Sequence, residues 1–205
     1  MNKRYYKIVL LIITSLAICF SQVSFAQNAK KDVKSTLKQL KKEGFTMETG
    51  TKDPKTVIAK FNEKLEEMGS VFILGTASNC KSTNICKQSA LNSAQNQLIR
   101  YVSGKVQGQI GTIMKHNSNN TDEEIDKMVG SIINNISADI SGCLINGFSA
   151  YKEHKDGSKE YRCYYIVNKK QIIQNLKYSL KETKMTIEEV ESISNFVKDS
   201  LDEME

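Results

Sequence analysis

The feature that most constrains the fold is a long amphipathic helix that follows a short, wholly apolar strand. Val71–Leu74 is a continuous apolar run, which is typical of a strand buried on both faces. From Thr83 to Lys115, apolar residues recur every three or four positions and predict one helix of about eight turns. The stripe consists of Ile85, Ala90, Leu91, Ala94, Leu98, Val102, Val106, Ile110 and Ile113. Three glycines in its second half leave two alternatives open, a close helix contact or fraying.

Two further strands are predicted on either side of a turn. Asp156-Gly157 is a strong hairpin signal, and it separates Ile140–Tyr151 from Tyr161–Val167. Two helices lie between the first and second strands, so the chain goes out and back, which favours antiparallel pairing. The sequence therefore predicts the α+β class. We expect a small three-stranded antiparallel sheet packed by the long helix and a second helix, with flanking N- and C-terminal helices.

Local signals define where the helices begin and what the second strand buries. Asp53 before Pro54 is typical of an N-cap followed by the first helical residue. Thr121–Glu124 and Thr186–Glu189 both fit the capping box. Asn168 is predicted to cap the helix after the hairpin. In the second strand, alternation places four residues on one face, and its glycines suggest bulges. The four residues are Ile140, Leu144, Phe148 and Ala150.

The N-terminus has the pattern of an export signal. Basic residues precede the apolar run Ile8–Phe20, and small residues stand at Ser24 and Ala26. The run is shorter than the roughly 20 residues that span a bilayer. We predict a signal peptide at 1–26, an N-terminal helical segment at 27–69 with a short extended piece at Phe45–Glu48, a core domain at 70–181 and an acidic C-terminal helix at 182–205. Lipidation at Cys19 is the alternative, although bulky Ile18 precedes it.

Charge is divided between the two ends of the chain, whose formal net charge is +6. Lys30–Lys42 is strongly basic and Glu182–Glu205 is acidic, so each helix is a candidate binding surface. Basic amphipathic helices also bind anionic membranes, so membrane contact without a transmembrane helix is an alternative for the first. No basic stripe with interleaved aromatic residues occurs, and we therefore expect no nucleic-acid partner.

The cysteines suggest one disulfide. Cys80 and Cys86 are the favoured pair because they close a short loop between a strand and a helix. If Lys155 faces Ser158 in the hairpin, Cys163 faces Ala150. Cys143 is then about 23 Å away along the strand, well beyond the roughly 7 Å that a disulfide allows. Cys143 and Cys163 are therefore expected to be free buried thiols.

Sequence motifs predict no enzyme. Neither histidine has a nucleophile or acid at motif spacing, and no phosphate-binding or metalloprotease motif is present. We expect no catalytic residue, no metal and no cofactor. Tyr161, Tyr164 and Tyr165 are the most suggestive cluster, because they could form a stacking surface for a ligand. Alternation puts Tyr164 on the opposite face from the other two, and packing of the sheet is the alternative.

The sequence resembles the Lpp-twenty-like family of small bacterial envelope proteins, as an exported Bacteroidetes-type member. The resemblance rests on Phe72–Ala77, an Ala-rich helix around Ala90–Ala94 and the final hairpin, and on the Lys-rich helix ending in Leu40–Phe45. It implies an α+β domain in the cell envelope and no catalytic residues. The chain departs from the family in lacking a good lipidation motif.

These observations predict a non-enzymatic exported envelope protein that binds a protein or an envelope component. Its expected location is the periplasm or outer envelope, with lipid anchoring as the alternative. A second hypothesis is a small-ligand carrier that uses a pocket between the long helix and the sheet.

Overall fold

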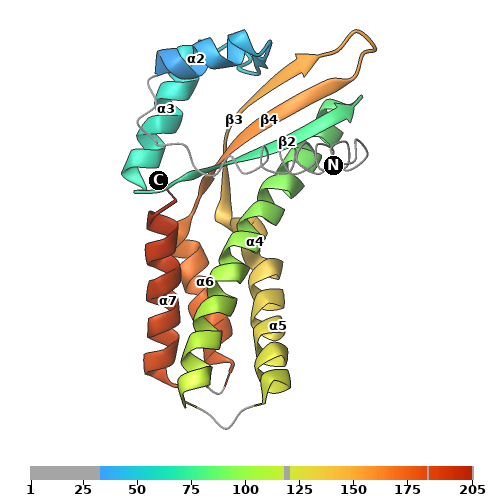
Figure 1. Cartoon of the computed structure of the whole chain (residues 1–205). Helices are drawn as coiled ribbons and strands as arrows, with labels where there is room; N and C mark the ends of the chain where they lie inside the picture. Colours follow the sequence, from blue (N-terminus) through green and yellow to red (C-terminus); the bar gives the residue numbers. More distant parts are fainter. Residues whose placement is uncertain (1–32, 118–120, 184, 205) are drawn as a thin grey trace, which may run out of the picture.

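The computed structural model describes residues 33–117, 121–183 and 185–204, and shows a four-stranded antiparallel sheet with helices on both faces (Figure 1). The strand order is β1-β3-β4-β2. The elements are α2 (Val33–Lys42), β1 (Thr46–Met47), α3 (Pro54–Glu67), β2 (Phe72–Cys80), α4 (Thr83–Asn117), α5 (Asp122–Asp139), a 3₁₀ turn (Ile140–Cys143), β3 (Leu144–Glu153), β4 (Lys159–Val167), α6 (Lys169–Lys181) and α7 (Ile187–Asp202).

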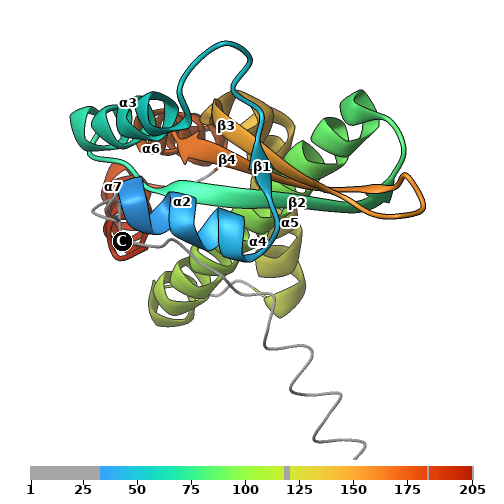
Figure 2. The same cartoon turned by 90° about the horizontal axis from the view of Figure 1, so that it is seen from above.

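The helices form two groups. α4 crosses one face of the sheet and continues beyond it, where it packs with α5, α6 and α7 in a bundle (Figure 1). α2 and α3 cover the opposite face, which is best seen from above (Figure 2). The α+β class is therefore confirmed, and the sheet separates two hydrophobic cores.

Capping side chains set the helix starts as predicted. Asp53 accepts a hydrogen bond from the backbone N–H of Thr56 at the start of α3. Thr121 and Thr186 each form a complete capping box with the glutamate three residues later. Asn168 caps α6. Each cap satisfies N–H groups that have no partner inside the helix.

The larger core lies between the sheet and the long helix. The predicted stripe of α4 is wrong at Ile85, which is 62% exposed, because its neighbour Cys86 faces the core instead. From Cys86 onward, every fourth residue is fully buried, as the periodicity predicts. These residues are Cys86, Ala90, Ala94, Leu98, Val102, Val106 and Ile110. The first three are small, and β2 has a glycine where α4 crosses it. A Cβ on Gly75 would lie 2.1 Å from the carbonyl oxygen of Ala90, so only glycine allows this contact.

The smaller core is aromatic. Phe61 of α3 makes edge-on contacts with Phe148 and Phe72, and Phe148 stacks on Tyr164 with ring centroids 4.2 Å apart. Leu40 of α2 and Leu65 of α3 complete the packing. Such aromatic pairs stabilise a core by about 0.5–1.5 kcal/mol each beyond their buried area.

Two predictions about the sheet need correction. It has four strands, because Thr46 and Met47 pair with Tyr151 and Ala150 of β3 and add β1 to the edge. β2 extends six residues past the apolar run, to Cys80. Its polar end continues as a strand because it pairs with β4 as far as Lys159, across a bulge.

The second strand also differs from its predicted alternation. Ile140 belongs to a 3₁₀ turn, and it lies in the larger core whereas Phe148 and Ala150 lie in the smaller one. The reason is an irregularity between Asn146 and Phe148, where Gly147 interrupts the pairing. A slip of one residue moves the following side chains to the other face. The hairpin register is also shifted by one, so that Cys163 faces Ser149.

Candidate functional site

The candidate site is a lysine-lined hollow between α2 and α3. α2 forms because Leu37 and Leu40 share a face, and Leu40 is buried in the smaller core. Gly44, with φ of 82°, ends the helix. The N–H of Gly44 bonds to the carbonyl of Lys41, and that of Phe45 to the carbonyl of Leu40. This is a Schellman motif, which turns the chain toward β1.

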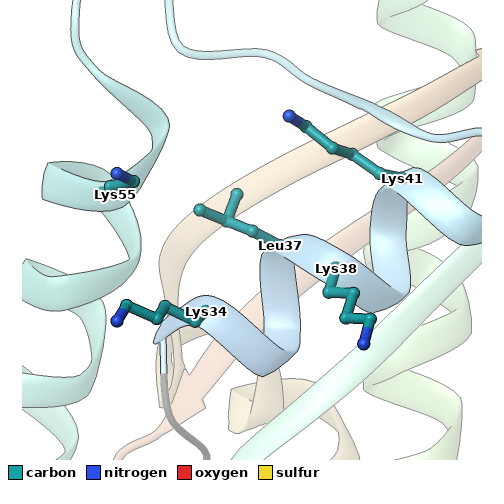
Figure 3. A pocket seen from close by; sticks show the side chains of 5 residues that line it. All are labelled: Lys34, Leu37, Lys38, Lys41 and Lys55. Carbon is teal, nitrogen blue, oxygen red and sulfur yellow. The ribbon is translucent and has the colours of Figure 1, made fainter.

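Four lysines surround one leucine in this hollow. Lys34, Lys38 and Lys41 come from α2, and Lys55 comes from the first turn of α3. Together with Leu37 they line a hollow of about 310 Å³. Lys34 and Lys41 extend on either side of Leu37 toward α3, whereas Lys38 extends away from it (Figure 3). We call this set of five residues the lysine surface.

Among the described residues, no carboxylate lines the lysine surface. α2 contains no acidic residue. Glu43, just beyond it, bonds to Arg162 of β4, and Asp53 is engaged in capping α3. Among the residues described, Lys38, Lys41 and Lys55 take part in no ion pair. Their charges therefore add up at the surface, where the resulting potential attracts anions.

The chemistry available here is binding. Each lysine ammonium offers three N–H donors on a flexible stem, which suits phosphate oxygens. Lys34 and Lys41 are seven residues apart, or about 10 Å along the helix axis, so they can contact different phosphates of one backbone. The described lining consists of four lysines and one leucine, without a histidine, cysteine, serine or carboxylate. Across the described part of the chain, no cluster of His, Cys, Asp and Glu is suited to a metal ion.

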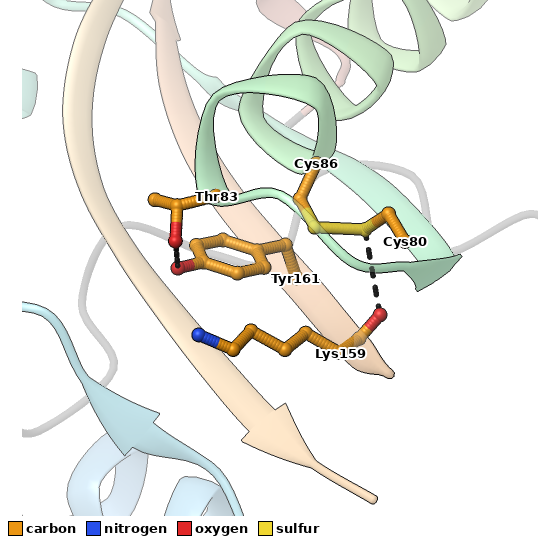
Figure 4. Close-up of a disulfide and its surroundings, with 5 residues drawn as sticks. All are labelled: Cys80, Thr83, Cys86, Lys159 and Tyr161. Carbon is orange, nitrogen blue, oxygen red and sulfur yellow. Dashed lines mark hydrogen bonds between the residues drawn. A yellow bond between two sulfur atoms is a disulfide. The ribbon is translucent and has the colours of Figure 1, made fainter. Parts of the chain in front are cut away.

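Cys80 and Cys86 form a disulfide at the corner between β2 and α4 (Figure 4). Their Cα atoms are 5.6 Å apart. The sulfur of Cys80 lies 3.4 Å from the carbonyl oxygen of Lys159, and the hydroxyl of Tyr161 lies 3.3 Å from that of Thr83. The disulfide thus holds the first turn of α4 against the ends of β2 and β4.

Cys143 and Cys163 are buried and take no part in the disulfide. Burial raises the pKa of the Cys163 thiol, since the thiolate would lose hydration. A thiol held in its neutral form is a poor nucleophile. Cys19 and the predicted signal peptide lie outside the described residues.

The three tyrosines are divided between the two cores. Tyr161 and Tyr165 are 2% and 6% exposed on the α4 face, and Tyr161 stacks on Tyr151. Tyr164 lies on the other face against Phe148. Burial raises the pKa of both Tyr164 and Tyr165. The structure therefore does not bring the three rings together, and a ligand-binding role for them stays a prediction.

The sequence indicated the basic helix α2, but not that Lys55 of α3 lies beside it. Lys55 belongs to the lysine surface only because α3 packs beside α2, which is a tertiary contact. The composition of α2, with four lysines and no acid, gave only a partial signal, because α6 has the same number of lysines and no acid either.

These features define an α+β protein with a disulfide and a lysine-lined surface. Comparison with known families adds one match: the family described as TFIIE alpha subunit matches residues 93–195. The match covers half of the chain, so the protein belongs to this family. It includes most of α4, all of α5, β3, β4 and α6, and half of α7, whereas the lysine surface precedes it. No curated protein and no solved structure matches the chain.

The family membership corrects several predictions. The resemblance to Lpp-twenty-like envelope proteins is wrong, and so is the function that it implied, an exported protein that binds an envelope component. The predicted location in the periplasm or outer envelope, lipid-anchored or not, is overturned by the same match. So is the expectation that nucleic acid is not a partner, because the family is one of transcription factors and not of enzymes. Within the described ranges, no helix is long and apolar enough to cross a membrane.

The hypothesis of a small-ligand carrier is also corrected. It required a pocket between the long helix and the sheet. The family match overturns this function as well, and at the crossing of β2 and α4 Gly75 lies directly against Ala90 and Ala94, with no space there for a methyl group.

Proposed function

We propose that the protein is a non-catalytic transcription factor that contacts the phosphate backbone of nucleic acid through the lysine surface. The observation that carries the proposal is the set of Lys34, Lys38, Lys41 and Lys55 around Leu37 with no carboxylate among them. Membership in the TFIIE alpha subunit family supports the transcriptional role.

The expected interaction is electrostatic and insensitive to sequence. Lysines bind phosphates as point charges, and the lysine surface contains no aromatic ring or amide side chain that could read a base edge. Binding should therefore weaken steeply with salt, because each neutralised phosphate releases counterions. The same surface should accept duplexes of different sequence with similar affinity.

The test is fluorescence anisotropy with short labelled DNA, duplex and single-stranded, over a range of salt. The triple variant K38Q/K41Q/K55Q should bind at least ~10-fold more weakly than the parent protein. The slope of log K against log salt should fall by about 2.7 on a duplex, or about 0.9 per lost contact. Circular dichroism would show that the variant is folded.

A charge-matched control separates a site from net charge. Lys170, Lys181 and Lys198 are exposed lysines of α6 and α7, away from the lysine surface. The variant K170Q/K181Q/K198Q removes the same charge and should bind as the parent does. Equal weakening in both variants, or no binding by the parent, would overturn the proposal.

A further inference from the structure

The two edges of the sheet differ in how far the backbone of the outer strand is covered. At one edge, β1 pairs with β3 at Tyr151 and Ala150, and the N–H of Glu48 then bonds to the carbonyl of Ser149. The backbone of β3 is therefore covered along this stretch. At the other edge, β2 is nine residues long and has a paired strand, β4, on one side alone within the described chain.

The alternation of hydrogen-bonded residues along β2 shows which of its backbone N–H and C=O groups point away from the sheet. The N–H of Val167 bonds to the carbonyl of Val71, so Ile73 and Gly75 also exchange bonds with β4. Phe72, Leu74 and Thr76 consequently direct their N–H and C=O groups away from the sheet. Of these groups, the carbonyl of Leu74 accepts a bond from the Gln97 side chain of α4, at 3.1 Å. The outward groups of Phe72 and Thr76 have no protein partner among the described residues.

β2 also lacks the usual protection of an edge strand. Natural edges carry charged side chains or proline, which oppose pairing with another strand. Phe72–Cys80 contains neither. By contrast, β3 includes Lys152 and Glu153, and β4 includes Lys159, Glu160 and Arg162. Of these three strands, β2 alone has no charged residue, and β2 is also the strand at the open edge of the sheet.

We propose that β2 pairs edge to edge with β2 of a second copy of this chain. An antiparallel pair about a twofold axis gives both edges the same bonds and joins two four-stranded sheets into one continuous sheet. A second copy is the occupant that fits because the strand is uncharged, so two identical edges meet without repulsion between like charges. Such an arrangement is closed, which limits the assembly to a dimer.

The first test is sedimentation velocity of the full chain from about 1 to about 300 µM, the range in which a weak interface forms. The protein should convert from monomer to dimer across this range. The variant T76K places an exposed charge on the open edge and should raise the dimer dissociation constant at least ~10-fold. The variant T46K makes the same change at an exposed position of β1, on the opposite edge, and should dimerise as the parent does.

Hydrogen exchange measured by NMR locates the contact without any variant. The outward amides of Phe72, Leu74 and Thr76 should gain protection as concentration rises, while the inward amides of Ile73 and Gly75 are protected throughout. A chain that stays monomeric at all concentrations would overturn the proposal. A dimer that leaves the outward amides unprotected would overturn it as well. Outward amides already protected in the monomer would show that another segment of this chain covers the edge, which also contradicts it.

Discussion

The two faces of the sheet are both covered by helices, but different kinds of side chain fill the two interfaces. The α4 face uses small and aliphatic side chains, with Ala90 and Ala94 against Gly75, so that the helix backbone comes close to the strand. The α2–α3 face uses aromatic rings, centred on Phe61, Phe148 and Tyr164. Backbone contact therefore fixes the long helix on one face, whereas ring packing fixes the two helices that present the lysine surface on the other.

The largest expected effect comes from the aromatic face. Phe61→Ala removes a ring that contacts three other aromatic rings, and should lower the free energy of unfolding by about 4 kcal/mol. Urea unfolding followed by circular dichroism measures the loss. Native-state hydrogen exchange should show α2 and α3 opening before α4. If the helices of both faces opened together, the two cores would not differ in local stability.

The next effect tests the close contact on the other face. Gly75→Ala adds a Cβ that would lie 2.1 Å from a backbone oxygen, which no side-chain rotation can relieve. We expect a loss of about 3 kcal/mol in urea unfolding, from displacement of α4. Gly142→Ala is the control, since nothing lies within 4 Å of its Cβ position. A tolerated Gly75→Ala would mean that α4 moves off the sheet at little cost.

The disulfide should contribute less, because it closes a short loop. A separation of six residues between Cys80 and Cys86 corresponds to about 2 kcal/mol in the chain-entropy treatment. The double variant C80A/C86A should lose that much in urea unfolding and keep its fold. Exchange of amides in the first turn of α4 should accelerate, while those of α2 should not change. Uniform acceleration would show that the disulfide acts on the whole molecule.

A gain in stability is expected at the exposed glycines of α4. Gly104 and Gly108 have helical neighbours and open space where a Cβ would lie. Replacing either with Ala should raise the free energy of unfolding by up to ~1 kcal/mol, because Ala loses less backbone entropy in a helix. Thermal unfolding provides the measurement. A loss at either position would indicate a contact that requires glycine there.

The smallest effect is the loss of stability at low pH that comes from protonation of Glu48. Burial acts to raise the pKa of Glu48, but hydrogen bonds from Lys87 and Ser149 and the charge of Lys87 outweigh it, so the pKa lies below its ordinary value of 4.5. A carboxyl with a lowered pKa stabilises the folded state above that ordinary value, and its contribution is lost as pH falls through the folded-state value. Since the pair is largely exposed, the contribution should stay below ~1 kcal/mol.

The measurement is urea unfolding of the parent and of Glu48→Gln at about pH 6 and about pH 3. The difference between the two proteins should shrink at the lower pH, because protonation of the Glu48 carboxyl removes the charge that Gln lacks. Glu43, whose pKa is also lowered, offers a comparison on the aromatic face, where Arg162 is its partner. A difference that did not depend on pH would exclude a role for the charge.

Local signals in the sequence predicted the helices well, because each depends on neighbours. The capping boxes at Thr121 and Thr186 and the stripe of α4 need only residues three or four positions apart. Features that depend on distant residues were predicted only in part. An extended piece at Phe45–Glu48 and bulges at the glycines of the second strand were expected, but the pairing of β1 with β3 and the change of face at Phe148 were not.

The candidate site follows the same division. The lysine-rich helix could be recognised from its composition, since α2 has no acid. Its place beside Lys55 depends on the packing of α3 against the sheet, which no local pattern encodes. The expectation of no nucleic-acid partner was wrong because it required aromatic residues within the basic stretch. Binding to a phosphate backbone needs only positive charge.

The length of α4 has a consequence for how the molecule unfolds. At 35 residues it is about 52 Å long, and it belongs to the sheet through Ala90 and Ala94 and to the bundle through Val106 and Ile110. If the sheet unfolded alone, the half of α4 that packs on it would be exposed while the bundle kept the other half. The reverse holds if the bundle unfolded alone. The sheet and the bundle are therefore coupled into one cooperative unit, and calorimetry should record a single transition in which the van't Hoff and calorimetric enthalpies agree.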